Sequence, residues 1–381
     1  MPRHRIGLLS TYPPKICGLA TFAAALQRGL VDLGHRVNVV RVDDHPTLTS
    51  PDHPVAGRMS NGDATSIAKA AALLSQGDVA IVQHEFGIYG GRDGREVLDL
   101  LRMLTVPSIV VLHTVPLHPT AHQTAVIADI DRLADRLVVM TDTAAARLLS
   151  LYPIEPARVS TIAHGATLGT SLPPGEPTRR PERKPQLLTW GLLGPGKGIE
   201  HAIAALPQLA DLGAAVDYTI AGVTHPKVQA MDGHAYRHSL ERLAERLGVA
   251  SMVHFDQRYR NVDDLTRFVA TSNLVILPYD SRDQVTSGVL VDALAAGRPV
   301  IATEFPHALD LRRSGAVMTV PHGDPTALAT AIRAVLTNDK LHAKMSSAAR
   351  RAAHAFSWEA IAEEYAELAD ELSMTTERAA V

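Results

Sequence analysis

The feature that most constrains this fold is a repeated alternation of short apolar runs with helical patterns. The runs are rich in Val, Ile and Leu, and polar stretches with helical spacing of apolar residues separate them. Parallel strands that are buried on both faces have this pattern, because each connection places a helix over the sheet. The alternation occurs once on each side of residues 170–185. The sequence therefore predicts an α/β protein with two Rossmann-like domains.

Twelve strands are predicted, six in each half. In the first half they are Ile6–Leu9, Arg36–Val42, Val79–Gln83, Ser108–His113, Arg136–Met140 and Val159–Ala163. In the second half they are Gln186–Trp190, Val216–Ala221, Met252–Phe255, Asn273–Leu277, Pro299–Ala302 and Ala316–Val320. A helix is expected over Ala20–Leu33, with Phe22, Leu26 and Leu30 on one stripe. It ends at Gly34, a residue that can adopt positive φ.

Residues 170–185 (TSLPPGEPTRRPERKP) are rich in Pro and Arg and have no apolar periodicity. Such a composition indicates a linker. We expect an N-terminal domain over residues 1–169 and a C-terminal domain over residues 186–355. A last segment, residues 356–381, contains a helix from Trp358 to about Leu372.

Composition excludes several classes of protein. A single cysteine, Cys17, rules out an internal disulfide framework and a four-cysteine metal site, and suits a reducing cytoplasm. A net charge of −3 gives no reason to expect nucleic acid as a partner. The N-terminal segment is expected to be a strand rather than a signal peptide, and no run of 18 apolar residues predicts a membrane span.

Thr189–Ile199 (TWGLLGPGKGI) predicts a strand, a glycine-rich turn and a helix. Gly194, Gly196 and Gly198 would let the backbone approach a phosphate, and Lys197 would supply a positive charge. The segment nearly satisfies the P-loop pattern of NTPases. However, Gly198 stands where a P-loop needs Ser or Thr to hold Mg²⁺. An NTPase and a plain tight turn with an exposed lysine remain as alternatives.

A second phosphate-binding segment is predicted in LPYDSRDQVTSGVLVDALAAGRPVIAT. Ser287, Gly288 and Val289 open a helix directly after a strand and a small-residue loop. Backbone amides and the helix dipole favour an anion at such a helix start. Gln284 and Asp292 lie on either side of this start, where they could bind hydroxyl groups or simply face solvent.

In the first half, polar residues follow the ends of predicted strands, where ligands of α/β proteins bind. Gly18 precedes the first helix, His84 and Glu85 precede a loop with Tyr89 and Gly90, and His113 ends the fourth strand. His118, His122 and His164 are further candidates, and a satisfied structural role is the alternative for each histidine. Their spacing does not support a metal site. Catalysis by Cys17 is not expected, because no histidine pairs with it in sequence context.

Together these segments closely resemble the retaining glycosyltransferases of family 4 (glycosyltransferase group 1). The resemblance covers almost the whole chain, in the order of the Pro-Pro and Gly18 loop, His113, GPGKG, the Gln284–Asp292 segment and the terminal helix. It implies a GT-B fold, in which two Rossmann-like domains with parallel sheets face each other across a cleft. The C-terminal helix of this fold crosses back to the first domain.

The resemblance also implies roles for individual residues. His113, Lys197 and Gln284 would be the catalytic residues. The donor would be bound by Gly18, Gly196, Lys197, Arg258, Ser287, Gly288, Val289 and Asp292. The acceptor would contact His84, Glu85, Tyr89 and Gly90.

Two positions depart from the family pattern. Leu192 stands where the family has an arginine that neutralises the donor diphosphate, and Gln284 replaces a glutamate. Arg258, Arg260 or Arg282 would have to replace the missing charge, with Arg258 the first choice. Gln284 can donate and accept hydrogen bonds but cannot stabilise positive charge as a carboxylate would.

The implied activity is transfer of a hexosyl group, mannosyl or glucosyl, from a nucleoside-diphosphate sugar to a hydroxyl of a sugar, glycolipid or small molecule, with retention. No metal or other cofactor is expected. The expected location is the cytoplasm. If the acceptor is a lipid, the protein would also contact a membrane peripherally. A nucleotide-sugar epimerase and a non-catalytic nucleotide-sugar-binding protein of the same fold are the alternatives.

Overall fold

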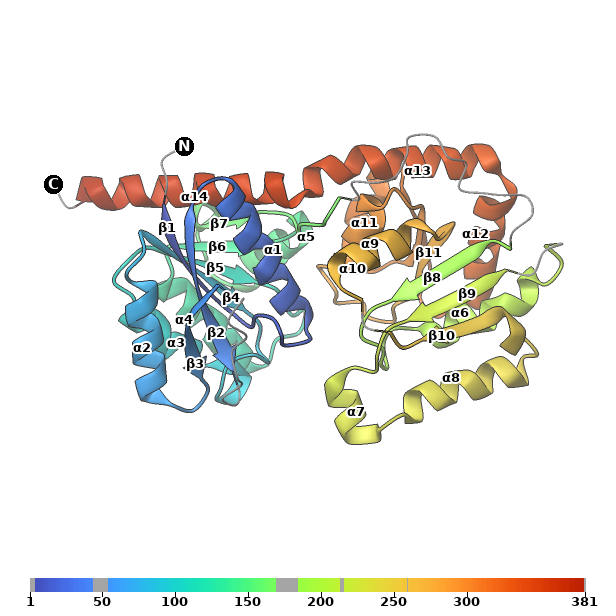
Figure 1. The fold of residues 1–381 in the computed structure, drawn as a ribbon, viewed down its shortest axis with the longest axis horizontal. Helices are drawn as coiled ribbons and strands as arrows, with labels where there is room; N and C mark the ends of the chain where they lie inside the picture. Colours follow the sequence, from blue (N-terminus) through green and yellow to red (C-terminus); the bar gives the residue numbers. More distant parts are fainter. Residues whose placement is uncertain (1–3, 44–53, 169–183, 213–215, 259, 380–381) are drawn as a thin grey trace. The chain divides into compact units, whose positions relative to one another are not determined.

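The computed structural model describes residues 4–43, 54–168, 184–212, 216–258 and 260–379 (Figure 1). Most of the predicted linker, residues 169–183, lies outside the described residues. Contacts divide the chain into two compact units. The first comprises Met1–Gly165 and Trp358–Val381, and the second comprises Ala166–Ser357.

The first unit contains a seven-stranded parallel sheet in the order β3-β2-β1-β4-β5-β6-β7. Its strands are β1 (Arg5–Ser10), β2 (Arg36–Asp43), β3 (Val55–Ser60), β4 (Val79–His84), β5 (Ser108–Leu112), β6 (Arg136–Val139) and β7 (Val159–Thr161). Leu8 on the interior strand β1 pairs with Val39 on one side and Ile81 on the other. All three side chains are fully buried, as expected for a sheet with helices on both faces.

Helices connect these strands and cover the sheet. They are α1 (Gly18–Asp32), α2 (Ala64–Leu74), α3 (Val97–Met103), α4 (Ala121–Leu133) and α5 (Asp142–Leu151), with α14 (Trp358–Ala379) added from the end of the chain. Phe22, Leu26 and Leu30 of α1 are all buried, and Gly34 has φ +92° after the helix. The predicted apolar stripe and the predicted helix stop are both confirmed.

The C-terminal helix α14 packs along α1 within the first unit (Figure 1). Its buried residues Ile361, Tyr365 and Leu368 join the same core as Phe22. Gly29 allows the close approach, because a Cβ there would lie 2.9 Å from both the Ala362 Cβ and the Trp358 carbonyl oxygen. The last helix therefore completes a core formed by the start of the chain.

The second unit contains a six-stranded parallel sheet in the order β10-β9-β8-β11-β12-β13. Its strands are β8 (Gln186–Trp190), β9 (Asp217–Ala221), β10 (Val253–Asp256), β11 (Leu274–Leu277), β12 (Val300–Thr303) and β13 (Val317–Val320). Its helices are α6 (Ile199–Ala205), α7 (Pro226–Asp232), α8 (Ala235–Arg246), α9 (Val262–Ala270), α10 (Gly288–Ala295), α11 (Pro306–Leu311), α12 (Pro325–Thr337) and α13 (Asp339–Ala353). Two apolar cores, one on each face, hold helices against this sheet.

The two parallel sheets agree with the predicted fold class, and all twelve predicted strands are present with shifts of at most two residues at their ends. The prediction omitted β3. This strand contains Gly57, is only partly buried and lies at the sheet edge, where it pairs with β2 alone. Its sequence, VAGRMS, therefore lacks the apolar signal of a buried strand.

Candidate functional site

The glycine-rich turn after β8 has the strand–turn–helix geometry predicted for Thr189–Ile199. Gly196 has φ +87°, and a Cβ there would meet no atom within 4 Å. Gly198 has φ +61° and precedes α6, and a Cβ there would lie 1.8 Å from the Pro278 carbonyl oxygen. The turn therefore requires glycine at 198 for packing, while Gly196 leaves its backbone open to a ligand.

Two contacts and one close approach join this turn to the segment after β11. The Asp280 amide donates to the Gly196 carbonyl oxygen at 3.0 Å. The Lys197 Nζ lies 4.3 Å from the centre of the Tyr279 ring. A Cβ at Gly191 would lie 3.7 Å from a methyl group of Val289, the second residue of α10. The structure thus brings together two segments, about 90 positions apart in sequence, that were both predicted to bind phosphate.

Ser287 caps α10 instead of offering its own groups to a phosphate. Its side-chain oxygen accepts a hydrogen bond from the Leu290 amide at 3.3 Å, and its own amide donates to His307 Nδ1 at 2.8 Å. Ser287 is also 3% exposed. Of the three residues predicted to bind the donor at this helix start, Gly288 and Val289 remain as candidates. Their amides lie in the first turn of α10, where no earlier helical carbonyl accepts from them.

Gln284 and Asp292 have different surroundings. The Gln284 Nε2 donates to the Thr286 carbonyl oxygen at 3.1 Å, which orients the side-chain amide within its own loop. Asp292 lies in α10 one turn beyond Gly288, and burial raises the pKa of its carboxyl to about 7. Hydrogen bonds from hydroxyl groups of a ligand would favour the ionised form of this carboxyl.

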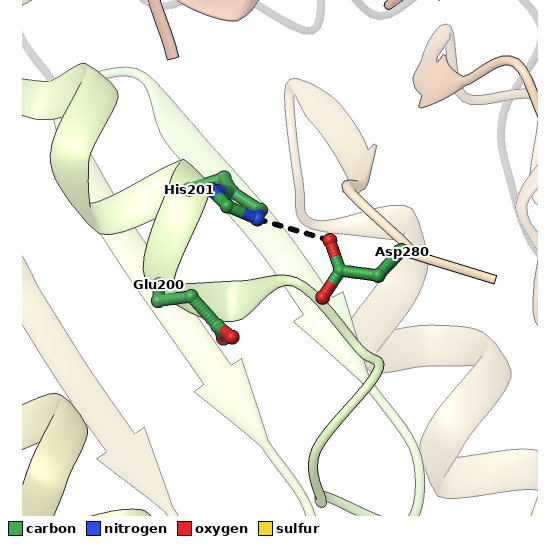
Figure 2. A group of neighbouring side chains, drawn as sticks. All are labelled: Glu200, His201 and Asp280. Atoms are coloured by element: carbon green, nitrogen blue, oxygen red, sulfur yellow. Dashed lines mark hydrogen bonds and ion pairs between the residues drawn. The ribbon is translucent and has the colours of Figure 1, made fainter. Parts of the chain in front are cut away.

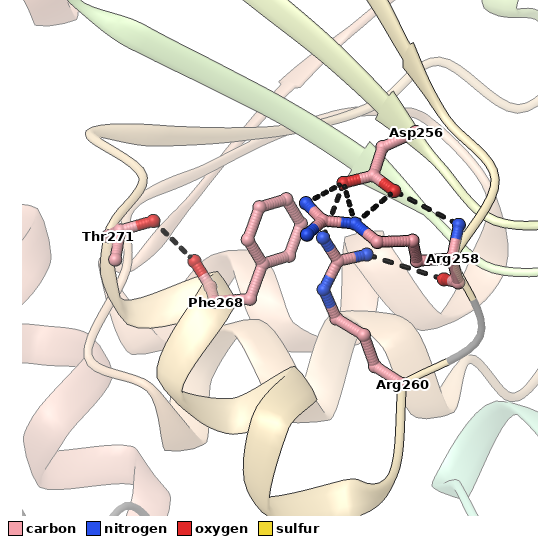
Figure 3. Close-up of polar contacts among 5 residues, drawn as sticks. All are labelled: Asp256, Arg258, Arg260, Phe268 and Thr271. Carbon is pink, nitrogen blue, oxygen red and sulfur yellow. Dashed lines mark hydrogen bonds and ion pairs between the residues drawn. The ribbon is translucent and has the colours of Figure 1, made fainter.

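Arg258 is already paired with a carboxylate. Its guanidinium and its backbone amide donate to Asp256, with distances of 2.7 to 3.2 Å, and Arg260 donates to the same carboxylate (Figure 3). The two arginines hold the pKa of Asp256 well below its usual range. Asp256 ends β10, the edge strand, which β9 separates from β8. No described contact brings Arg258 to Lys197.

Arg282 is better placed than Arg258 to replace the charge missing at Leu192. Arg282 lies two positions after Asp280, and the Asp280 amide donates to the Gly196 carbonyl oxygen. The Arg282 side chain is exposed. Within the described part of the chain its side chain has no ion pair. Arg260, by contrast, also lies 3.8 Å from the centre of the Phe268 ring.

One group of side chains in this unit has the composition of a metal site. Glu200, His201 and Asp280 each offer a ligand atom, and these atoms lie within 4.8 Å of one another. His201 Nε2 and an Asp280 carboxylate oxygen are hydrogen-bonded at 2.9 Å (Figure 2). The Glu200 carboxylate accepts a hydrogen bond from the Tyr236 hydroxyl at 3.1 Å. This group was not predicted, because Asp280 lies far along the chain from the adjacent Glu200 and His201.

In the first unit, the structure brings His84, Glu85 and His113 together at the ends of β4 and β5. The His113 amide donates to the His84 carbonyl oxygen at 3.0 Å, and the Thr114 hydroxyl donates to Glu85 at 2.5 Å. His84 is fully buried between Phe86 and Tyr89, and neither ring nitrogen has a partner among the described residues. Burial lowers the pKa of His84 to about 4.

His113 is held as a neutral ring. Burial, with the neighbouring His164 and His84, lowers its pKa to about 3. Its Nε2 lies 2.5 Å from the Gln83 Oε1, and Phe22 packs edge-on against it with ring centres 5.0 Å apart. Gln83 is fully buried and was not predicted as a site residue. A polar residue in the apolar run VAIVQH was the sequence signal for it.

Other predicted acceptor residues have structural partners. The Tyr89 hydroxyl donates to the Gln83 carbonyl oxygen at 2.6 Å, and the side chain is 4% exposed. A Cβ at Gly90 would lie 2.3 Å from a Glu96 carboxylate oxygen. Tyr89 and Gly90 therefore shape the loop after β4. Gly18, by contrast, is exposed, and a Cβ there would meet no atom within 4 Å.

Cys17 has a capping role that the sequence analysis missed. Its sulfur accepts a hydrogen bond from the Ala20 amide at 3.3 Å and lies 3.2 Å from the Thr11 hydroxyl. The thiol thus occupies the position at the start of α1 that Ser, Thr, Asp or Asn usually fills. This contact explains Cys17 without nucleophilic chemistry.

Two family descriptions match this chain. Residues 16–169 match Glycosyltransferase Family 4, and residues 176–352 match Glycosyl transferases group 1. The D-inositol 3-phosphate glycosyltransferase of Nocardioides sp. is 30% identical over 239 residues, which are 59% of this chain and 51% of that protein. A protein of the same name from Catenulispora acidiphila is 28% identical over 76% of this chain and 71% of its own length. For the first few relatives, the match spans about half of their length.

Solved structures show the same fold. Anabaena HepE in complex with UDP has a TM-score of 0.77 at 18% identity, covering 97% of this chain and all of that chain. Sucrose-phosphate synthase from Thermosynechococcus elongatus has a TM-score of 0.76 at 19% identity, covering 98% and 100%. The family matches on both halves and these likenesses to GT-B structures agree with the resemblance found in the sequence. The chain belongs to the group 1, family 4 glycosyltransferases and has the GT-B fold.

Proposed function

We propose that this protein is a retaining glycosyltransferase that transfers a hexosyl group from a nucleoside-diphosphate sugar to a hydroxyl of a sugar-like acceptor. The observation that carries this proposal is the junction of the Gly191–Gly198 turn with the start of α10. Lys197 and the first amides of α10 lie at adjoining strand ends, where a diphosphate would meet a cation and a helix dipole together.

A cavity beside this junction suits the nucleoside part of a donor. Its volume is about 80 Å³, and it lies at the ends of β9 and β10 next to Leu193 of the glycine-rich turn. Its wall includes Phe255 and Arg237, whose Nη1 is buried with no partner among the described residues. A buried guanidinium N–H can only donate, so it suits a carbonyl group of a base. Among common bases, uracil, thymine, cytosine and guanine carry such a group, and adenine does not.

The comparisons support a uridine nucleotide as the first donor to test. The fold neighbours from Anabaena are described in complex with UDP and with UDP-glucose, and the relatives are named for transfer to D-inositol 3-phosphate. We therefore place UDP-hexoses first among donors and polyols or sugars first among acceptors. Glucosyl is thereby favoured over mannosyl as the transferred group.

The residues fit a same-face substitution. The acceptor oxygen bonds to the anomeric carbon as the bond from that carbon to the diphosphate oxygen breaks, and the leaving phosphate takes the acceptor proton. Lys197 and the α10 amides would stabilise the leaving charge. Neutral His113 would hydrogen-bond a sugar hydroxyl. Glu85, a conceivable carboxylate nucleophile, already accepts hydrogen bonds from the Phe86 amide and the Thr114 hydroxyl.

Because a lysine and helix amides would carry the leaving charge, we propose that transfer needs no metal ion. EDTA should leave turnover unchanged. Loss of activity with EDTA and recovery with a divalent cation would contradict this and direct attention to Glu200, His201 and Asp280.

Among the described residues no helix combines the length and apolarity that a membrane span requires. For a lipid acceptor, we propose that the protein would contact the membrane at its surface.

A thermal-shift panel with UDP, GDP, ADP and TDP, with and without Mg²⁺, tests donor binding. We expect stabilisation by UDP without Mg²⁺, because a ligand that binds only the folded state raises the melting temperature. A chromatographic assay with UDP-glucose and myo-inositol or an inositol phosphate then tests transfer. Binding of UDP with no transfer to any polyol or sugar would favour a non-catalytic binding protein, and conversion of the donor alone would indicate an epimerase.

A further inference from the structure

Tyr279 forms a fixed aromatic surface at the end of β11. Its side chain is 1% exposed, and its ring stacks on Phe305 with ring centres 5.2 Å apart. Its carbonyl oxygen accepts hydrogen bonds from the Thr303 hydroxyl at 2.5 Å and from His322 Nδ1 at 2.8 Å. Backbone and ring are thus both held in place, so the ring face that does not stack on Phe305 has a single orientation.

The Lys197 ammonium lies over this ring, 4.3 Å from its centre. The same turn is held at its backbone, because the Asp280 amide donates to the Gly196 carbonyl oxygen at 3.0 Å. Gly198 packs against the Pro278 carbonyl oxygen on the other side of Lys197. Three consecutive residues after β11 therefore contact three consecutive residues of the glycine-rich turn.

The nearby carboxylate does not neutralise Lys197. Asp280 directs its side chain to His201 Nε2, at 2.9 Å (Figure 2). The Glu200 carboxylate accepts a hydrogen bond from the Tyr236 hydroxyl. Within the described residues Lys197 has no ion pair. An ion pair would fix the ammonium but also cancel its field, whereas an aromatic face attracts a cation through its quadrupole and leaves the charge and its N–H donors available.

From these contacts we propose that Tyr279 is a positioning residue for Lys197. Its ring holds the flexible lysine side chain over the phosphate-binding junction before the donor arrives, and so reduces the rotamer entropy that binding would remove. This inference rests on the proposed function, since it assumes that Lys197 binds the donor diphosphate. Asp280 contributes by anchoring the backbone of the turn and by keeping its carboxylate on His201.

The hydroxyl of Tyr279 provides a matched control. It is buried and has no hydrogen-bond partner among the described residues. Tyr279→Phe therefore removes an unsatisfied polar group while it keeps the ring, and should preserve or slightly raise the melting temperature. Tyr279→Leu removes the aromatic face and keeps an apolar side chain in the core.

The test measures the Kd for UDP by calorimetry in wild type, Tyr279→Phe, Tyr279→Leu, Lys197→Met and the Tyr279→Leu/Lys197→Met double variant. We expect Tyr279→Phe to bind within twofold of wild type and Tyr279→Leu to bind about three- to tenfold more weakly. The double variant should bind no more weakly than Lys197→Met, because the ring acts through the lysine.

A second measurement does not depend on the leucine variant folding. Phenylalanines with increasing numbers of fluorine atoms, introduced at position 279, weaken the ring quadrupole with little change of shape. The affinity for UDP should fall stepwise with fluorination, and a merely structural ring would give no such trend.

The outcomes separate the two proposals. Failure of wild type to bind any nucleoside diphosphate would overturn the donor site itself. If wild type binds UDP and Lys197→Met weakens binding, the donor site stands. In that case the positioning role of Tyr279 is wrong if Tyr279→Leu binds like wild type, if it weakens the Lys197→Met variant by the same factor, or if fluorination has no effect.

Discussion

The strand ends of the two units carry opposite kinds of chemistry. In the first unit, β4, β5 and the segment after β7 present His84, His113 and His164, and burial lowers the pKa of all three to about 4 or below. In the second unit, the ends of β8 and β11 present Lys197, a helix start and a half-buried carboxyl at Asp292. Neutral rings suit hydroxyl groups, and a cation with helix amides suits phosphate. Two parallel sheets of the same type thus place different ligand-binding groups at their strand ends.

The largest effect is expected where Lys197 of the second unit would bind the donor diphosphate. Lys197→Ala should lower turnover about 100-fold and weaken UDP binding by a similar factor, since hydrogen bonds to charged groups contribute about 1.5–3 kcal/mol. Steady-state kinetics and calorimetry measure both quantities. Unchanged turnover would remove Lys197 from the mechanism, and a normal melting temperature would show that the variant is folded.

The variant His113→Ala tests whether the neutral rings of the first unit bind a sugar hydroxyl. We expect turnover to fall about 30-fold, which corresponds to about 2 kcal/mol, with UDP affinity within twofold of wild type. A His113→Ala variant that loses as much UDP affinity as Lys197→Ala would contradict a role for His113 on a sugar hydroxyl. His164→Ala is the matched control, because its Nδ1 is bonded to the Gly165 carbonyl oxygen.

The carboxyl at Asp292 should make UDP binding depend on pH. Ribose hydroxyls donate to the ionised form, and with a pKa of about 7 the ionised fraction falls about tenfold between pH 8 and pH 6. Affinity should therefore decrease as the pH falls through 7, by up to about tenfold. Asp292→Asn should bind more weakly at pH 8 and lose the part of the pH dependence that does not come from UDP itself. The same pH profile in both proteins would contradict this role.

The smallest effect compares two arginines of the second unit. Arg282→Ala should weaken UDP binding about fivefold at low salt and less at high salt, because exposed charges are screened. Arg258→Ala should change UDP affinity less than twofold, since Arg258 is already bonded to Asp256. The reverse order would restore Arg258 as the replacement for the missing arginine at position 192.

Much of the fold could be predicted from sequence, because buried parallel strands leave an apolar signal that does not depend on their neighbours. The edge strand β3 was missed for the same reason, as Gly57 and its partly exposed neighbours weaken that signal. The glycine-rich turn and the start of α10 were also predictable, since Gly198 and Ser287 are local requirements of turn and cap geometry.

Partners of individual side chains could not be predicted. The Ser287 amide donates to His307, and the Arg258 guanidinium donates to Asp256. Neither group is therefore as available for a ligand as its sequence position indicated. Gln83 and Tyr279 were missed, because their roles depend on residues about 30 and 80 positions away. Charge and hydrogen-bonding capacity are properties of a residue, whereas the partner that a residue bonds depends on which groups the fold places beside it.

The sequence by itself determined the two parallel sheets, the glycine-rich turn, the helix start at Ser287 and the family. These depend on periodicity and on local backbone requirements, which are present in any short stretch of chain. Only the tertiary structure decided that Lys197 lies on the Tyr279 ring, that His113 is neutral beside Gln83, and that desolvation raises the pKa of the Asp292 carboxyl. Burial and proximity set these properties, because desolvation and pairing act through space between residues that are distant along the chain.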